Sequence, residues 1–208
     1  MKNVKIVDHP LLKHKLAFLR DKETNSAEFR RITKEVAKYM AFEALRDMSV
    51  ASSKVETPLA TAVVEKIDNP PIVVSIMRAG NGMLDAVLEA MPFAGAGHIG
   101  IYRDKFIQNT VEYYFKIPEN CKAKEVLLLD PLIASGDTVL ASIDRLKNYE
   151  VGKIKVISIL GSRKGLELIS EAHPDVEIYT LEIEENMNEK AYLVPGLGDA
   201  GDRLFQTV

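Results

Sequence analysis

The stretch VLLLDPLIASGDT, residues 126–138, decides the fold of this chain. Its first four residues are an unbroken apolar run, which is typical of a strand buried on both faces of a parallel sheet. The run ends on the carboxylate of Asp130, and after a short connection apolar residues recur at helical spacing. These are Val139, Ile143 and Leu146. The stretch therefore predicts a buried strand, a loop of small residues and a helix that begins near Asp137.

The loop between this strand and this helix has the parts of a phosphate site. Ser135 and Thr138 supply hydroxyl groups, and Gly136 lets the backbone approach a ligand closely. The free N–H groups and the dipole at a helix start favour an anion there. An ordinary N-cap made by Asp137 or Ser135 explains the same residues, so both interpretations stay open on the sequence alone. A Walker loop is disfavoured because no lysine precedes the Ser/Thr, and the G-x-G-x-x-G spacing of a dinucleotide site is absent.

Charged residues follow three of the apolar runs. A carboxylate at a strand end, one short loop from a phosphate site, suits a ribose 5-phosphate, with the acid on the sugar hydroxyls. The run at 72–76 leads to Arg78, and the run at 98–102 ends on Arg103. Open α/β sheets bind ligands in the crevice at the carboxyl ends of their strands, so we expect Arg78 to point into that crevice. An arginine that merely reaches solvent is the alternative.

Several stretches carry a family resemblance. Residues 130–138 resemble the phosphoribosyl-diphosphate (PRPP) loop of phosphoribosyltransferases. Three more resemble the uracil phosphoribosyltransferase family: ETPL at 56–59, MRAGNGM at 77–83 and YLVPGLGDAGD at 192–202. The last is highly specific to this family, and the match runs in the same order over nearly the whole chain. The resemblance implies transfer of the 5-phosphoribosyl group of PRPP to N1 of uracil, which releases diphosphate and gives uridine monophosphate (UMP) in pyrimidine salvage.

The resemblance also implies roles for individual residues. PRPP would be bound by Arg78, Arg103, Asp130, Pro131, Leu132, Ile133, Ala134, Ser135, Gly136, Asp137, Thr138 and Asp199. Asp130 and Arg103 would act in catalysis, Asp130 by holding the ribose in line and Arg103 by neutralising the leaving diphosphate. Uracil would be bound by backbone groups near Leu193, Gly198, Asp199 and Ala200. A side chain added at Gly198 is expected to intrude on the plane of the base.

Mg²⁺ is the implied cofactor, bound mainly through PRPP. Pro131 follows Asp130, as in the uracil family, so one carboxylate stands at the strand end and no protein cage for a metal is expected. After the alanine the family more often has Thr-Gly-Gly-Ser, where this chain has Ser-Gly-Asp-Thr. Asp137 therefore brings a negative charge near the 5-phosphate unless its side chain points away as a cap.

Alternating strand and helix patterns predict an α/β fold, with a mostly parallel sheet flanked by helices. The resemblance implies that this is a phosphoribosyltransferase-type core. Residues 1–208 are expected to form one domain with a small cap. A mobile arm at 104–116, which departs from the family pattern as residues 49–54 do, would close over the site and exclude water. The other predicted elements are helices at 25–48 and 163–173 and strands at 72–76, 98–102, 154–160 and 176–183. Tyr39 and Ala172 would face inward, and Glu182, Glu184 and Glu185 would form a hydrated acidic turn.

Composition limits the partners and the compartment. The 208 residues are 47% hydrophobic and 27% charged with a formal net charge of −3, which argues against a broad nucleic-acid-binding face. The one cysteine, Cys121, is expected to be an exposed thiol in a reducing compartment. No apolar run approaches the length of a membrane span. We therefore expect a cytoplasmic protein without nucleic-acid or membrane partners. The resemblance adds a homo-oligomer, dimer or tetramer, with GTP as a candidate effector.

Two other functions compete with uracil transfer. The first is a phosphoribosyltransferase for another base, which the uracil-type segment at 192–202 disfavours. The second is a regulator on the same fold that binds pyrimidine RNA leaders. Such a protein needs a basic face with aromatic or guanidinium stacking groups. The acidic balance and the seven scattered tyrosines predict no such face.

Overall fold

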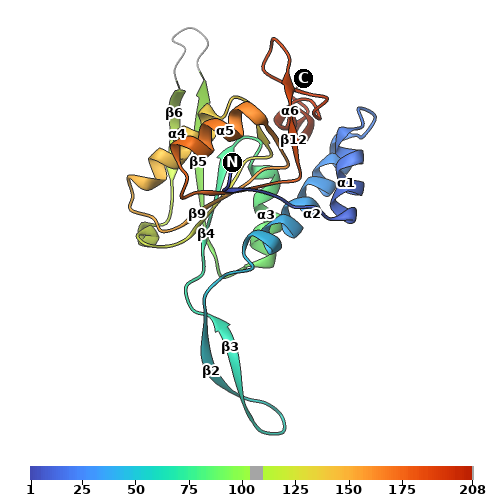
Figure 1. Cartoon of the computed structure of the whole chain (residues 1–208). Helices are drawn as coiled ribbons and strands as arrows, with labels where there is room; N and C mark the ends of the chain where they lie inside the picture. Colours follow the sequence, from blue (N-terminus) through green and yellow to red (C-terminus); the bar gives the residue numbers. More distant parts are fainter. Residues whose placement is uncertain (104–109, 208) are drawn as a thin grey trace.

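A seven-stranded sheet forms the centre of the molecule, with the strand order β1-β11-β9-β7-β4-β5-β6 (Figure 1). The computed structural model describes residues 1–103 and 110–207. All neighbouring strands run parallel except β5 and β6, which are antiparallel. The strands are β1 (Val4–Ile6), β4 (Ile72–Met77), β5 (Gly95–Arg103), β6 (Thr110–Lys116), β7 (Val126–Leu129), β9 (Ile154–Ile157) and β11 (Glu177–Thr180). The predicted α/β fold with a mostly parallel sheet is therefore confirmed.

Helices cover both faces of this sheet. They are α1 (Pro10–Arg20), α2 (Ser26–Ala44), α3 (Asn81–Ala90), α4 (Asp137–Lys147), α5 (Arg163–Ala172) and α6 (Ala200–Phe205), with a short 3-10 helix at Glu119–Cys121. Leu127 and Leu129 of β7 pack with α1, α2 and α3 in one apolar cluster. Val126 and Leu128 pack with α4 and α5 in the other cluster. Strand β7 is thus buried on both faces, as its unbroken apolar run predicts.

Two small sheets lie beside the carboxyl ends of the central strands. Strands β8 (Leu132–Ile133), β10 (Leu160–Ser162) and β12 (Glu182–Glu184) form a three-stranded parallel sheet. Strands β13 (Asn186–Met187) and β14 (Leu193–Val194) form a short antiparallel pair. We refer to these five short strands as the cap.

The structure corrects the predicted length of two strands. The apolar runs at 154–160 and 176–183 are each broken, the first into β9 and β10 and the second into β11 and β12. At the first break, the N–H of Ile159 leaves the central ladder and donates to Pro131 O at 2.9 Å. At the second, the N–H of Leu181 donates to Ile159 O at 3.1 Å. The chain therefore passes from the central sheet into the cap while its side chains remain apolar, so the sequence pattern shows no break.

Some helices and strands of the structure were not predicted, or were predicted with other bounds. Helix α1 and strand β1 were not predicted, and α2 ends at Ala44 rather than near residue 48. The polar stretch from 49 to 60 is part of a hairpin, in which β2 (Val50–Glu56) pairs with β3 (Thr61–Ile67). This hairpin projects away from the body of the molecule (Figure 1). Thr57 closes its turn by donating its N–H to Ala60 O at 3.0 Å.

Four side-chain predictions were wrong. Tyr39 and Ala172 are exposed rather than inward. Cys121 is buried, because the 3-10 helix turns its thiol inward while the neighbouring lysines stay outside. Glu182 and Glu184 do not form a hydrated turn, since both lie in β12 and form ion pairs with Arg20.

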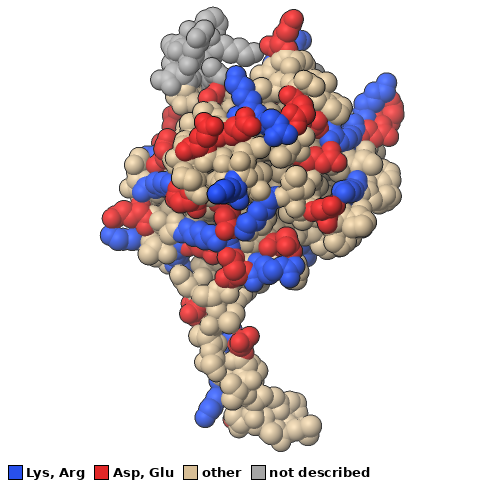
Figure 2. Space-filling model, in the orientation of Figure 1, with Lys and Arg blue, Asp and Glu red and all other residues tan. Residues whose placement is uncertain are grey.

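No helix in the described part of the chain is long and apolar enough to cross a membrane. On the face that Figure 2 shows, lysine and arginine side chains are interspersed with aspartate and glutamate over the body. That face therefore carries no continuous basic field of the kind an RNA-binding surface requires.

An ion-pair network fastens the end of α2 to the central sheet. Lys155 of β9 is fully buried and forms ion pairs with Asp47 and, at 2.8 Å, with Glu125. Asp47 also forms an ion pair with Lys153 at 3.0 Å. The hydrogen bond from Lys155, opposed in part by burial, holds the pKa of Asp47 down at about 2. A buried ammonium group needs such partners, because desolvation is costly for an unpaired charge.

We predict that Asp47→Asn destabilises the protein in a pH-dependent way. The folded pKa of about 2 lies below the unfolded value of about 3.9, so the stabilisation is present above pH 4 and is lost as the pH falls through 2. Because the Asp47 side chain is 58% exposed, we expect a loss of only about 1 kcal/mol at pH 7. Urea unfolding across this pH range should show the difference from wild type shrinking towards pH 2, and a constant difference would contradict the prediction. Asp68→Asn, at a surface aspartate bonded to Ser49, is the control.

Candidate functional site

Three charged residues lie at the carboxyl ends of neighbouring strands. Asp130 follows β7, Arg78 follows β4 and Arg103 is the last residue of β5. These strands are adjacent in the order β7-β4-β5 and run parallel. The sheet topology therefore brings the three residues to the same edge, where an open α/β sheet binds its ligands.

Asp130 has an unusual electrostatic environment. Burial raises the pKa of its carboxyl to about 7, although a hydrogen bond from the backbone N–H of Leu132 lowers it in part. The backbone N–H of Asp130 donates to Ile157 O at 3.1 Å, which ties the strand end to β9. A raised pKa means that the ionised carboxylate is poorly compensated by its surroundings. A cation or sugar hydroxyl groups could therefore serve as its partners.

The segment after Asp130 is partly a strand rather than a loop. Leu132 and Ile133 form β8, which pairs with β10 of the cap, and Pro131 O accepts from the N–H of Ile159 at 2.9 Å. The turn into α4 needs Gly136, whose φ of +89° lies in the left-handed region. A Cβ at Gly136 would also lie 2.7 Å from Gly165 O.

Neither Ser135 nor Asp137 is the N-cap of α4. The N-cap is Gly136, which has no side chain to make a capping hydrogen bond. Asp137 is the first residue of the helix rather than its cap. Among the described residues, the hydroxyl groups of Ser135 and Thr138 are therefore not used as caps. The helix start offers its N–H groups to an anion, as a phosphate site requires.

Two residues that support this turn were missed in the sequence. The hydroxyl group of Ser162 donates to Ala134 O at 2.5 Å and accepts from the N–H of Gly165 at 2.8 Å. A Cβ at Gly165 would lie only 2.3 Å from Ala134 O. The start of α5 thus supports the turn through this hydrogen bond and this close backbone contact. Its only sequence signal is an N-cap serine with a glycine three residues later.

Arg78 lies against the C-terminal helix. Its Nη2 donates to Asp202 Oδ1 at 3.1 Å and its Nη1 to Thr207 Oγ1 at 3.1 Å. The bonds from Thr207 and then Arg78 hold the pKa of Asp202 below its usual value. The Arg78 side chain is 54% exposed. It therefore neither lies fully inside the crevice nor merely extends into solvent, the two alternatives that the sequence left open. It is paired and yet open to a ligand.

The segment from 193 to 200 carries the residues expected to read a base. Leu193 lies buried in β14, and Asp199 is the N-cap of α6, where its Oδ1 accepts from the N–H of Asp202 at 3.0 Å. Among the described residues, none accepts a hydrogen bond from the N–H groups of Gly198, Asp199 or Ala200. These three successive donors are therefore available to a ligand.

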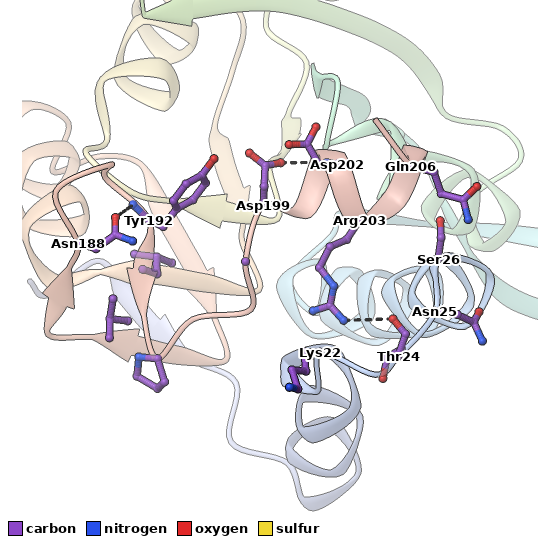
Figure 3. A pocket seen from close by; sticks show the side chains of 14 residues that line it. Lys22, Thr24, Asn25, Ser26, Asn188, Tyr192, Asp199, Asp202, Arg203 and Gln206 are labelled. Carbon is purple, nitrogen blue, oxygen red and sulfur yellow. Dashed lines mark hydrogen bonds between the residues drawn. The ribbon is translucent and has the colours of Figure 1, made fainter. Parts of the chain in front are cut away.

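An open cavity of about 880 Å³ lies beside this segment. Figure 3 shows Asn188 and Tyr192 on one side of it, Asp199 and Asp202 in the middle, and Arg203 with the start of α2 on the other side. The segment 193–200 thus forms one wall, and the connection between α1 and α2 forms the opposite wall.

Glycine at position 198 is required by the backbone. Its φ is +81°, so any other residue would strain the chain there. A Cβ built at this position would meet only Arg203 Cδ, at 3.6 Å, which is an ordinary contact. The expected intrusion of a side chain on the base therefore stays a prediction.

The arm lies largely outside the described residues. Arg103 pairs with Thr110 in the β5–β6 ladder, and the predicted arm at 104–116 includes the edge strand β6. Residues 104–109, on which the expected closure depends, are not among those described. No group of three or more His, Cys, Asp or Glu side chains within the described ranges is arranged to hold a metal ion.

Comparisons with known proteins agree on one family. A family model described as uracil phosphoribosyltransferase matches residues 6–207. The uracil phosphoribosyltransferases of Polaromonas naphthalenivorans and Halalkalibacterium halodurans are 44% and 45% identical to the chain, with full coverage of both sequences. The structure of the AQ2163 protein from Aquifex aeolicus matches with a TM-score of 0.92 at 32% identity, over 98% of each chain. Adenine phosphoribosyl transferase from Trypanosoma brucei shares the fold, with a TM-score of 0.60 at 14% identity, over 96% of this chain and 89% of that one.

We predict that Asp130→Asn stabilises the ligand-free protein at neutral pH. Unfolded Asp130 ionises near pH 4 and the folded group near pH 7, so wild type loses stability as the pH rises between these values. The asparagine variant has no ionisable group at this position, so its stability relative to wild type should rise by about 3 kcal/mol between pH 4 and pH 7. Urea unfolding at several pH values tests this. An advantage that does not change with pH would contradict the raised pKa.

Proposed function

The chain belongs to the uracil phosphoribosyltransferase family, and from this premise we propose how its residues carry out the transfer. The reaction joins N1 of uracil to C1 of PRPP, releases diphosphate and gives UMP, a step of pyrimidine salvage. The observation that supports the proposed site best is that Asp130 and Arg78 follow adjacent parallel strands, and that Arg78 is bonded to Asp202 of α6, the helix that begins at the free N–H groups.

Asp130 and the turn that follows it hold the phosphoribosyl group. The carboxyl group accepts from the ribose hydroxyls, and the N–H groups at the start of α4 bind the 5-phosphate with the hydroxyls of Ser135 and Thr138. The adenine phosphoribosyl transferase of Trypanosoma brucei, which has the same fold, was solved with AMP, pyrophosphate and ribose-5-phosphate. Fixing the ribose in this way places C1 in line between base and leaving group.

Arg78 and Arg103 neutralise the diphosphate as it leaves. Negative charge grows on the diphosphate while C1 becomes oxocarbenium-like, so fixed cations at this edge favour the transition state. Arg78 reaches the diphosphate by exchanging its bonds to Asp202 and Thr207 for bonds to phosphate oxygens. Mg²⁺ bound mainly through PRPP would add to this neutralisation, and the buried carboxyl of Asp130 fits a site beside such a cation.

Uracil is recognised by backbone groups. It presents an N–H donor at N3 between two carbonyl acceptors, and the free N–H groups of Gly198, Asp199 and Ala200 complement the acceptors. A backbone carbonyl near Leu193 would accept from N3. Cytosine has a bare acceptor at N3 and an amino group at position 4. It would leave buried polar groups unpaired, at about 1–3 kcal/mol for each group.

We also propose that the enzyme acts in the cytoplasm as a homo-oligomer, a dimer or a tetramer, with GTP as a candidate effector. The compartment is supported by the single, buried cysteine. The assembly and the effector rest on the resemblance to the family.

Base-dependent release of diphosphate tests the function directly. Purified protein with PRPP and Mg²⁺ should release diphosphate with uracil and at least a hundredfold more slowly with cytosine, adenine or hypoxanthine, as expected when two buried groups lose their partners. Omission of Mg²⁺ in the presence of a chelator should slow the reaction with uracil. Equal rates with uracil and cytosine would contradict recognition by the backbone.

We predict that Gly165→Ala weakens PRPP binding without touching the substrate. The added methyl would lie 2.3 Å from Ala134 O and must displace the phosphate turn. We expect the KM for PRPP to rise about tenfold or more, with a smaller change in the KM for uracil. Gly95→Ala is the control, because its methyl would meet only side-chain atoms, Pro118 Cγ at 3.0 Å and Ile72 Cγ1 at 3.9 Å. An unchanged KM for PRPP in folded Gly165→Ala would show that α5 does not support the turn.

A further inference from the structure

Two arginines hold the segment that carries the free N–H groups. Arg20, the last residue of α1, donates from Nη1 to Gly196 O at 2.8 Å. Arg203 of α6 donates from Nη1 to Leu197 O at 2.8 Å. The carbonyls of two successive residues, immediately before Gly198, are therefore bonded to guanidinium groups from two different helices.

Arg20 connects this segment to the cap. Its Nη2 lies 2.5 Å from Glu182 Oε2 and 2.7 Å from Glu184 Oε1, both on β12. Glu184 is buried, and its Oε1 has no hydrogen-bond partner in the described part of the chain, so the ion pair with Arg20 compensates its charge. One planar guanidinium group thus bridges two carboxylates and one backbone carbonyl, a geometry that suits its fixed fork of donors.

Arg203 connects the same segment to the end of α1. Besides Leu197 O, its guanidinium group donates to Leu19 O, to Asp21 O at 2.6 Å and to Thr24 O at 3.4 Å. It also lies over the ring of Phe29, 4.2 Å from the ring centroid. Figure 3 shows the side chain reaching from α6 across to Thr24. Every acceptor of Arg203 is a backbone carbonyl, so this residue joins three segments of main chain.

We propose that Arg20 and Arg203 are positioning residues for recognition of the base. By bonding the carbonyls of Gly196 and Leu197, they fix the backbone in the conformation that leaves the N–H groups of Gly198, Asp199 and Ala200 without an acceptor. Two glycines with positive φ, Gly196 at +58° and Gly198 at +81°, flank these bonds and would otherwise make the segment adaptable. The guanidinium groups of both arginines are bonded to protein acceptors, so their proposed role is exerted through the backbone. This inference rests on the proposed recognition of uracil by the backbone.

The substitution of lysine for arginine separates positioning from charge. In Arg20→Lys the ammonium group still neutralises Glu184, but a compact point charge cannot also bridge Glu182 and the carbonyl of Gly196 in one plane. Arg20→Lys should therefore stay folded and lose positioning, whereas Arg20→Met leaves Glu184 without its cation and should lose stability as well. Arg163→Met is the matched control. Arg163 pairs with Glu185, one residue beyond Glu184, and makes no described contact with segment 193–200.

The experiment measures kcat and KM for both substrates, and the ratio of rates with uracil and cytosine, for Arg20→Lys, Arg203→Lys and Arg163→Met. We expect Arg20→Lys and Arg203→Lys to raise the KM for uracil about tenfold or more, to lower the uracil-to-cytosine ratio, and to change the KM for PRPP by less than about twofold. Arg163→Met should match wild type. Thermal unfolding of each variant shows whether it is folded.

The outcomes distinguish this inference from the proposed function. If the KM values for both substrates rise together, or if the folded lysine variants keep the wild-type KM and the wild-type selectivity, the positioning role is wrong while the proposed function stands. If wild type itself shows no preference for uracil over cytosine, recognition by the backbone fails first. A selective wild type with lysine variants that lose affinity for uracil alone supports the inference.

Discussion

The burial of β7 on both faces is the constraint on which the rest of the structure depends. Four apolar residues without an exposed face can be accommodated only inside the sheet, with a parallel neighbour on each side and a layer of helices above and below. The first polar side chain after such a strand must then lie at the carboxyl edge, and this residue is Asp130. Strand β4, whose residues before Met77 are buried as completely, delivers Arg78 to the same edge by the same rule.

The backbone of the two segments that form the proposed site is fixed by specific contacts. The turn after β8 meets the start of α5 at Gly136 and Gly165, where two backbones approach too closely for any side chain. The segment that follows β14 is instead held by long side chains, which reach from α1 and α6 to single carbonyls. In the proposed site, phosphate and base would thus be bound by backbone groups that are fixed in two different ways, one by close packing and the other by guanidinium bonds.

Much of this arrangement could be predicted from the sequence, and the failures have physical causes. The buried strand, the glycine turn and the helix start at residue 137 are local, so an apolar run, one glycine and a helical period were enough to find them. The breaks at Ile159 and Leu181 were hidden, because the side chains stay apolar while the backbone changes its hydrogen-bond partner. Ser162, Arg20 and Arg203 were missed for a related reason. The contacts by which they hold the two segments are made to backbone carbonyls, which every residue carries and which therefore leave no mark in the sequence.

The environment of Asp130 would couple the proposed binding of PRPP to the release of protons. Burial raises the pKa of this carboxyl to about 7, and a bound cation or a set of ribose hydroxyls would favour its ionised form. Protons would then pass from the site to the solvent as PRPP binds. The heat of binding would include the ionisation heat of the surrounding buffer, and the affinity for PRPP would vary with pH near neutrality.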